Sequence, residues 1–393
     1  MNPGTAPRLA ARGVLAFAQV DWHGTWYSRH QILSRLARTC RVVVVEHPSP
    51  MRDVLAGKIS ARPVLESVAP NLWTYHPPRL LPEIFRPVAA RKLLDRLRAR
   101  HLRSSVRRLG LVDPVIYAWH PQYAPAIALQ PERFTIFHCY DKYDAYHDAP
   151  VAAVLAEERQ LVDRSDLVFA SSRILADDIQ QRTGHPVRYV PHGVDFAYFR
   201  ERADRDPLPP DLAALPRPRI GYVARLDERI DDEALREIAT ARPDWSLVII
   251  GGDGFQSAEG RSRFQSLCSL PNVHAIGQRP REAIPAYTAG LDVCLLCYRS
   301  DNWGRWVQPI KAYEYLACGR PVVSAPIDAA LDFGDLVTVV PEPKRWVAAI
   351  EAALAADGPE ERARRIEFAR TNTWDQRVAD LVAQIEEQLK SAG

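Results

Sequence analysis

The stretch QPIKAYEYLACGRPVVSA, residues 308–325, combines a short helix, a glycine stop and an apolar strand. Pro309 suits the first position of a helix, and Gly319 suits the position just after its end. Pro321 then opens the run PVVSA, which has the composition of a buried strand. The stretch therefore predicts one helix-to-strand unit of a larger α/β sheet.

The helix in this stretch carries two opposite charges on one face. At about 100° per residue, Lys311, Glu314, Tyr315 and Cys318 fall on one arc. A helix N-terminus offers unpaired N–H groups and a partial positive charge, which Lys311 reinforces, so a diphosphate is favoured there. Glu314 is placed to accept hydrogen bonds from vicinal hydroxyls, and together these features predict a sugar-nucleotide site. The alternative is an ordinary (i, i+3) ion pair on the helix surface.

Length and composition indicate a globular protein of two domains. The chain has 393 residues, 47% of them hydrophobic and 25% charged,. Its start, MNPGTAPRLAARG, lacks the apolar core of a signal peptide, and no apolar run approaches membrane-spanning length, so we expect a cytoplasmic protein,. The six cysteines lie in apolar segments and are expected to be reduced core residues,.

Positive charge is concentrated between residues 79 and 110. This segment contains ten Lys or Arg residues but only two acidic residues, Glu83 and Asp95, so its formal charge is +8. The whole chain has a formal net charge of +3, so the remainder carries −5. Leucines and valine interrupt the charges at helical spacing, which predicts a basic amphipathic helix. Two interpretations stay open: peripheral contact with anionic inner-membrane lipid, or a solvated helix face. A nucleic-acid partner is not expected, because no binding motif accompanies the charge.

Short apolar runs separated by helical stretches recur along the whole chain. In the first half they cover residues 13–19, 42–47, 72–77, 115–120, 134–140, 167–172 and 187–193. In the second half they cover residues 219–224, 247–252, 273–277, 293–297, 321–325 and 336–340. This alternation predicts an α/β protein with two doubly wound, Rossmann-like domains facing each other across a cleft.

The predicted domains are residues 1–200 and 219–370. Residues 201–218 are rich in proline and charge without periodicity, so we expect an interdomain linker there. A last helix within 371–393 has no strand to follow and is expected to pack back on the first domain. A dinucleotide-dependent dehydrogenase is disfavoured, because neither the loop after the first strand nor GGDGF at 251–255 completes a GxGxxG fingerprint.

Four stretches resemble the family 4-like GT-B glycosyltransferases that build bacterial exopolysaccharide, capsule or lipopolysaccharide. They are PIKAYEYLACGRPVV (309–323), VPHGVDFAYF (190–199), the strand–helix–strand segment 220–252, and FHCYDKYDAY (137–146) with the segment 158–172 that follows it. The resemblance implies transfer of a sugar from a nucleoside-diphosphate sugar to a glycan or lipid-linked acceptor.

The same resemblance assigns the donor side of the site. It implies that Glu314 binds the nucleotide ribose, that Lys311 lies near the phosphates, and that Arg225 is a phosphate-binding arginine. Trp306 occupies the position where many relatives carry a second glutamate that holds the transferred sugar, so the sugar and the stereochemistry stay open. The full set expected to bind the donor is Glu314, Lys311, Arg225, Gln308, Tyr222 and His192.

The acceptor side is expected in the first domain. The resemblance to glucuronosyltransferases that also lack the second glutamate implies that Asp141 is the catalytic base, which takes a proton from the acceptor hydroxyl. Asp144 is its rival, and helix capping is the alternative for both. Other polar or aromatic residues at strand ends suit sugar binding, although interface packing would explain the aromatic ones equally. The set expected to bind the acceptor is Asp21, Trp22, His23, Trp119, His120 and Asp144.

No metal and no cofactor is expected, since neither HExxH spacing nor a DxD pair occurs in a plausible loop,. The helix dipole, Lys311 and Arg225 would then stabilise the departing diphosphate. Two alternatives remain: a nucleotide-sugar epimerase of the same fold, and a degenerate sugar-nucleotide-binding protein without catalysis.

Overall fold

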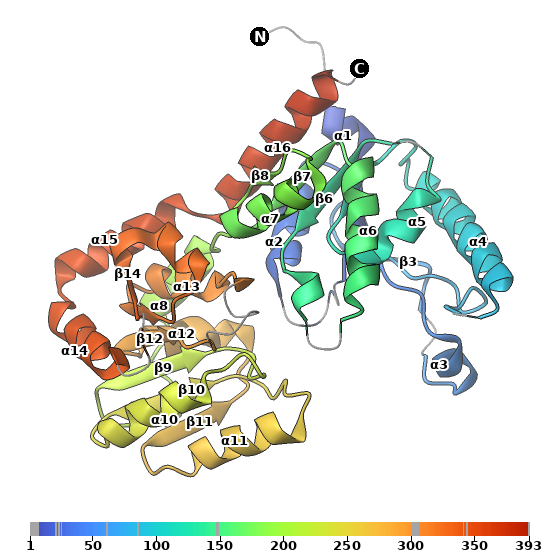
Figure 1. The fold of residues 1–393 in the computed structure, drawn as a ribbon. Coiled ribbons are helices and arrows are strands. Elements are labelled where there is room, and N and C mark those ends of the chain that lie inside the picture. The colour runs from blue at the N-terminus through green and yellow to red at the C-terminus, as the bar shows by residue number, and fades with distance from the viewer. Residues whose placement is uncertain are drawn as a thin grey trace, which may run out of the picture. The chain divides into compact units, whose positions relative to one another are not determined.

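The computed structural model describes residues 8–19, 22, 24, 26–59, 62–84, 86–131, 133–146, 149–299, 306–340, 342 and 345–391. The chain divides into two compact units (Figure 1). Unit 1 comprises residues 1–191 and 377–393, and unit 2 comprises residues 192–376. Each unit has its own sheet and its own hydrophobic core.

Unit 1 is built on an eight-stranded sheet with the order β3-β4-β2-β1-β5-β6-β7-β8. Every pair of neighbours is parallel except β3 and β4. The strands are β1 (Val14–Phe17), β2 (Val42–Val45), β3 (Leu65–Ala69), β4 (Leu72–Tyr75), β5 (Val115–Ala118), β6 (Thr135–Cys139), β7 (Leu167–Ala170) and β8 (Arg188–Tyr189). Seven were predicted, and β3 was missed because it is a half-buried edge strand without a continuous apolar run.

Helices and short 3₁₀ turns connect these strands. They are α1 (Arg8–Arg12), α2 (Ser28–Leu36), α3 (Met51–Leu55), α4 (Val88–Arg107), η1 (Pro121–Tyr123), α5 (Ala124–Ala128), η2 (Tyr143–Ala145), α6 (Val151–Arg164) and α7 (Arg173–Thr183). The central strands are buried along their whole length, as expected of a parallel sheet covered by helices,.

Unit 2 is built on a six-stranded, all-parallel sheet with the order β11-β10-β9-β12-β13-β14. The strands are β9 (Arg219–Val223), β10 (Ser246–Ile250), β11 (Val273–Gly277), β12 (Val293–Leu296), β13 (Val322–Ser324) and β14 (Val337–Val339), all of which were predicted. The helices of this unit are α8 (Phe196–Arg205), α9 (Pro210–Ala213), α10 (Asp232–Ala241), α11 (Ala258–Cys268), η3 (Arg281–Ala283), α12 (Ile284–Ala289), α13 (Ile310–Ala317), η5 (Asp328–Leu336), α14 (Trp346–Ala356) and α15 (Pro359–Thr371).

The segment expected to be a linker, 201–218, is folded into unit 2. It contains the end of α8 and all of α9, and α8 contacts α12 and α13. Phe199 and Leu212 are buried in the core of the unit. Charged residues cover the rest of these short helices, so the composition concealed two elements that each bury one apolar side.

The last helix, α16 (Trp374–Ser391), begins in unit 2 and continues in unit 1 from Arg377. Its buried residues recur every three or four positions, as one face of a helix requires; they are Trp374, Val378, Leu381, Ile385 and Leu389,. In unit 1, the carboxylate of Glu386 accepts a hydrogen bond of 2.8 Å from the backbone N–H of Leu9. The terminal helix therefore joins the two ends of the chain within unit 1.

Candidate functional site

Helix α13 has the bounds that the sequence predicted. Pro309 precedes its first residue, and Gly319, with φ of +71°, follows its last turn. Lys311 and Glu314 are half-buried on this helix. Tyr315 and Cys318, which the sequence places on the same arc as these two charges, are instead fully buried in the core.

Tyr315 is buried, and its hydroxyl links helix α13 to strand β9. The hydroxyl accepts a hydrogen bond from the backbone N–H of Val223 and donates one to the carbonyl of the same residue, each 3.1 Å long. Strand β12 pairs with β9 only through Ile220 and Gly221. The Tyr315 hydroxyl thus satisfies the backbone of Val223 just before the loop that carries Arg225.

Lys311 and Glu314 do not pair with each other. Among the described residues, neither side chain forms a hydrogen bond or an ion pair, so the interpretation as a surface ion pair is not supported. Burial raises the pKa of Glu314 to about 7, although Lys311 and Arg281 lower it in part. A half-buried carboxyl without a protein partner needs an explanation, and a bound ligand supplies one.

Arg225 follows β9 at the carboxyl edge of the sheet. A bridge between Leu226 and Asp253 extends β9 alongside the loop after β10. A Cβ atom at Gly254 would collide with the side chain of Arg225, so this glycine lets the arginine lie across the loop. Arg225 is exposed, and no described residue forms an ion pair or hydrogen bond with its guanidinium.

The three other predicted donor residues differ in their surroundings. Gln308 precedes α13, and its amide Nε2 is buried without a hydrogen-bond partner in the described part of the chain. Tyr222 is buried within β9, where its ring lies 6.5 Å from that of Tyr298. His192 is buried with its ring 5.7 Å from Trp374. Gln308 therefore lies just before the helix that carries Lys311 and Glu314, whereas Tyr222 and His192 are packed among other side chains.

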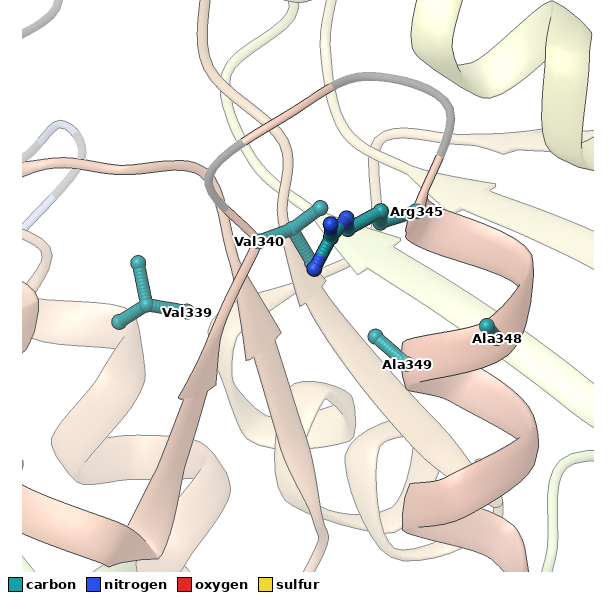
Figure 2. Close-up of a pocket in the computed structure, with 5 residues that line it drawn as sticks. All are labelled: Val339, Val340, Arg345, Ala348 and Ala349. Carbon is teal, nitrogen blue, oxygen red and sulfur yellow. The ribbon is translucent and has the colours of Figure 1, made fainter.

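A separate cavity of about 460 Å³ lies where β14 meets α14 (Figure 2). Its lining residues are Val339, Val340, Arg345, Ala348 and Ala349. No predicted site residue is among them, so this cavity does not belong to the donor site.

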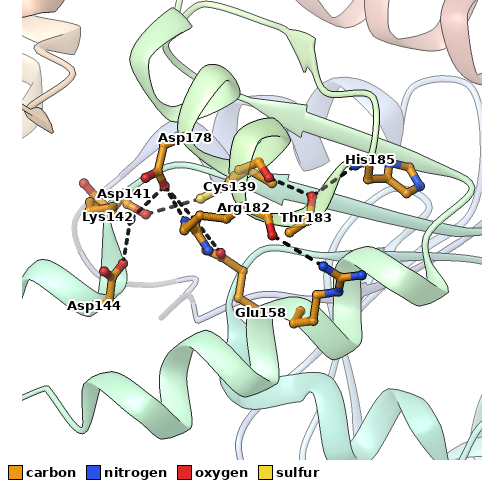
Figure 3. A network of polar contacts seen from close by, with 11 residues as sticks. Cys139, Asp141, Lys142, Asp144, Glu158, Asp178, Arg182, Thr183 and His185 are labelled. Carbon is orange, nitrogen blue, oxygen red and sulfur yellow. Dashed lines mark hydrogen bonds and ion pairs between the residues drawn. The ribbon is translucent and has the colours of Figure 1, made fainter.

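In unit 1, Asp141 lies two residues after the end of β6. Its carbonyl accepts hydrogen bonds from the Sγ of Cys139, at 3.2 Å, and from the backbone N–H of Tyr143, at 3.1 Å. The next residue, Lys142, is buried and pairs with Asp178 at 2.7 Å and with Asp144 at 3.2 Å (Figure 3). Asp144, expected to bind the acceptor, therefore also anchors Lys142.

The polar network continues from Asp178 into the helices of unit 1. The guanidinium of Arg182 lies 2.6 Å from a carboxylate oxygen of Asp178 and 2.6 Å from one of Glu158 (Figure 3). Burial raises the pKa of Glu158, and Arg182 opposes that effect. Burial also raises the pKa of Asp178, but hydrogen bonds from Arg182 and Lys142 outweigh it and leave that pKa below its usual value. The network fixes the segment that begins at Asp141.

The aromatic residues predicted to bind the acceptor are more buried than a sugar-stacking surface requires. Trp119 has no exposed surface and stacks on Tyr117 with ring centroids 3.8 Å apart. Trp22 is 8% exposed and its ring lies 5.1 Å from that of His30. Both contacts correspond to packing within unit 1. Asp21 and His23 lie outside the described residues.

Among the predicted acceptor residues that the structure describes, His120 and Asp144 are both half-buried and polar. The Nδ1 of His120 accepts a hydrogen bond of 3.1 Å from the backbone N–H of Gln122 and so caps η1. Burial, together with the charges of Arg29 and His47, lowers the pKa of His120 to about 4. The ring is therefore neutral near pH 7, with its hydrogen on Nε2.

Sequence reasoning missed Tyr315, Lys142 and Arg281. Lys142 lies between two aspartates in DKYD, so the charge pattern offered a signal for its ion pair with Asp144. Tyr315 is hydrogen-bonded to Val223, and the charge of Arg281 lowers the pKa of Glu314. Both partners are distant in the sequence, so only the fold brings them together.

Comparison with known proteins gives matches to glycosyltransferases. Residues 217–356 match the family model described as glycosyl transferases group 1. The Bacillus subtilis protein TuaH, named as a glycosyltransferase of teichuronic acid biosynthesis, is 26% identical over 233 residues. This alignment covers 56% of the chain and 57% of TuaH, so the chain matches little more than half of that relative.

Solved structures match over nearly the whole chain. A sucrose-phosphate synthase from Thermosynechococcus elongatus superposes with a TM-score of 0.72 at 18% identity, covering 97% of this chain and 99% of that one. An α,α-trehalose 6-phosphate synthase from Burkholderia multivorans gives 0.68 at 15% identity, with coverage of 97% and 99%. At these identities the likeness establishes the fold alone.

The chain thus has the two-domain GT-B fold, and residues 217–356 are similar to the glycosyl transferases group 1 family. The predicted fold class and the predicted resemblance to glycosyltransferases are confirmed. Lys311, Glu314 and Arg225 all lie inside the segment that matches the family model.

Proposed function

We propose that this protein transfers a sugar from a nucleoside-diphosphate sugar to a glycan or lipid-linked acceptor in cell-surface polysaccharide synthesis. The observation that carries the proposal is the set of three charges in unit 2 that have no partner among the residues the structure describes. Lys311 and Arg225 suit the anionic oxygens of a diphosphate, and the carboxylate of Glu314 suits ribose hydroxyls. The role in cell-surface polysaccharide synthesis is supported by the similarity to TuaH.

The proposed chemistry needs one base and stabilisation of the leaving group. The Asp141 carboxylate takes the proton of the acceptor hydroxyl as that oxygen attacks the anomeric carbon of the donor sugar. The bond from that carbon to the diphosphate breaks, and Lys311, Arg225 and the N-terminus of α13 stabilise the departing charge. We propose that no metal ion or other cofactor takes part.

We also propose that the protein works at the cytoplasmic face of the inner membrane, in peripheral contact with anionic lipid. None of the described helices has the length and apolar content that crossing a bilayer requires. Helix α4 exposes Leu93 and Leu97 beside Arg91, Lys92 and Arg96. Apolar side chains among cations suit the headgroup region of such a membrane.

The proposed activity is tested by incubating the purified protein with UDP, GDP and dTDP sugars and measuring both donor binding and release of nucleoside diphosphate. We expect at least one donor to bind, and Glu314→Gln to weaken that binding about tenfold or more, since a charged hydrogen-bond acceptor is lost. The matched control is Glu360→Gln, an exposed glutamate at the start of α15, which should bind like the wild type.

Three outcomes would contradict the proposal. Failure to bind any nucleotide sugar removes it altogether. Conversion of the donor without any acceptor identifies an epimerase, and tight binding without turnover on any acceptor identifies a non-catalytic binding protein.

A further inference from the structure

Unit 1 contains a second group of polar atoms without partners, on a different part of the chain from Asp141. The Nε of Arg29, the Nε2 of Gln122 and the hydroxyl of Tyr123 are all buried, and none forms a hydrogen bond of good geometry with a described residue. The Gln122 side chain does lie close enough to the Tyr123 hydroxyl to lower its pKa, so Arg29 is the member with no such neighbouring partner. Arg29 lies on the first turn of α2, and the other two belong to η1. We call these three residues and His120 the rim cluster, because α2 and η1 follow the carboxyl ends of β1 and β5.

The members of the rim cluster lie near one another. Strands β1 and β5 pair in parallel with Phe17 opposite Ala118, so the segments that follow them begin side by side. In agreement with this, the positive charge of Arg29 acts on His120 and Tyr123. The rings of His120 and Tyr143 are 4.3 Å apart. Burial raises the pKa of Tyr123, and the neighbouring Gln122 amide and Arg29 lower it in part. The guanidinium of Arg29 forms no ion pair in the part of the chain that the structure describes.

The rim cluster offers hydrogen-bond donors almost exclusively. Arg29 and the Gln122 Nε2 can only donate, the Tyr123 hydroxyl has its hydrogen free, and the neutral His120 presents Nε2–H because its Nδ1 is already an acceptor,. The nearby carboxylate of Glu46 is engaged by His76 at 2.8 Å, and that of Glu83 lies 3.9 Å from His47. A ligand with several lone pairs and a negative charge would satisfy these donors together.

We propose that the rim cluster binds an anionic oxygen group, either a phosphate or a carboxylate, carried by the acceptor. The assignment to the acceptor rests on the proposed function, whereas the anion site itself does not. The proposal gives unit 1 a means of selecting charged over neutral acceptors, because leaving these buried donors unpaired disfavours a ligand that lacks the anion.

The test measures binding of three probes by calorimetry: glucose 1-phosphate, glucuronic acid and glucose. The first two distinguish a phosphate from a carboxylate, and glucose is the neutral control. We expect one of the anionic probes to bind and Arg29→Met to weaken it about 10- to 100-fold, as for loss of a charge-assisted hydrogen bond. Arg52→Met, at an exposed arginine of α3 in unit 1, is the matched control and should bind the same probe like the wild type. Arg225→Met is a separate arm that tests whether the probe occupies the donor site instead.

A second variant separates ligand binding from folding. Tyr123→Phe removes a buried hydroxyl that forms no hydrogen bond of good geometry with a described residue, so we expect weaker probe binding with a nearly unchanged unfolding temperature,. The proposal is overturned if Arg29→Met binds the anionic probes as tightly as the wild type, or if only Arg225→Met reduces binding, since the probe would then occupy the donor site. Nucleotide-sugar binding by Arg29→Met, which should be intact, reports on the proposed function independently.

Discussion

The hydroxyl of Tyr315 is hydrogen-bonded to both backbone groups of Val223, at 3.1 Å in each case. Tyr315 follows Glu314 on α13, and Val223 ends the strand that leads to Arg225. One buried side chain therefore connects the helix that carries Lys311 and Glu314 to the strand that leads to Arg225 in the candidate donor site.

Tyr315→Phe should destabilise the protein and weaken donor binding together. The change leaves the N–H and C=O groups of Val223 unpaired in a buried position, which costs about 1–3 kcal/mol of unfolding free energy. Urea unfolding measures that loss, and calorimetry measures donor affinity. An unfolding midpoint equal to that of the wild type would show that these hydrogen bonds contribute nothing to stability.

Glu314→Gln should change stability in a pH-dependent way. Because the folded-state pKa of Glu314 is raised to about 7 from 4.5, the native protein binds this proton more tightly than the unfolded chain,. Wild-type stability should therefore fall, relative to the variant, as pH rises from about 4.5 to about 7. We expect the variant to be the more stable protein at pH 8 and to show little difference at pH 4.5. Urea unfolding at both pH values checks this, and a constant difference between them would contradict it.

Asp141→Asn should reduce turnover at least 100-fold and leave donor affinity nearly unchanged, because the amide cannot accept the acceptor's proton. Single-turnover kinetics and calorimetry measure the two effects separately. Asp144→Asn is the comparison variant, and we expect it to lower stability more than turnover, since it removes an ion pair to Lys142. Wild-type turnover in Asp141→Asn would remove Asp141 from the mechanism.

Lys142→Met should destabilise unit 1 by about 3 kcal/mol, because among the described residues it leaves the carboxylate of Asp178 paired with Arg182 alone in a partly buried network,. Thermal unfolding measures the change. The double variant Lys142→Met with Asp178→Asn should recover part of the loss, since the uncompensated charge is then absent. Additive effects of the two substitutions would show that the pair is not coupled.

The double variant Lys92→Gln with Arg96→Gln should weaken binding to vesicles that contain anionic lipid by about 25-fold at low salt, at about 1 kcal/mol for each cation. Flotation with such vesicles measures this, and salt should reduce binding by the wild type. Arg370→Gln with Lys390→Gln removes the same charge elsewhere on the chain and should bind like the wild type. If the wild type fails to bind anionic vesicles at low salt, the membrane proposal falls.

The sequence was informative wherever a structural signal is local. Strands such as 42–47 and 273–277 were predicted because a buried parallel strand needs a short continuous apolar run. The helix of α13 was predicted from Pro309 and Gly319, which act on their own turn of backbone. The segment 201–218 was wrongly predicted to be a linker because α8 and α9 each bury only one side. For α8, that side is recognisable only from its contacts with α12 and α13.

The sequence by itself determined two α/β sheets, the α13 helix and the charges of Lys311 and Glu314 on one of its faces. Only the tertiary structure showed that these charges have no partner in the described part of the chain, that Tyr315 is buried against Val223, and that Lys142 engages Asp144 and Asp178. The physical reason is that helix and strand periodicity arise from neighbours along the chain. Burial and hydrogen-bond pairing instead depend on residues that folding brings together from distant positions, so the unpaired donors of the rim cluster could not be recognised before the fold was known.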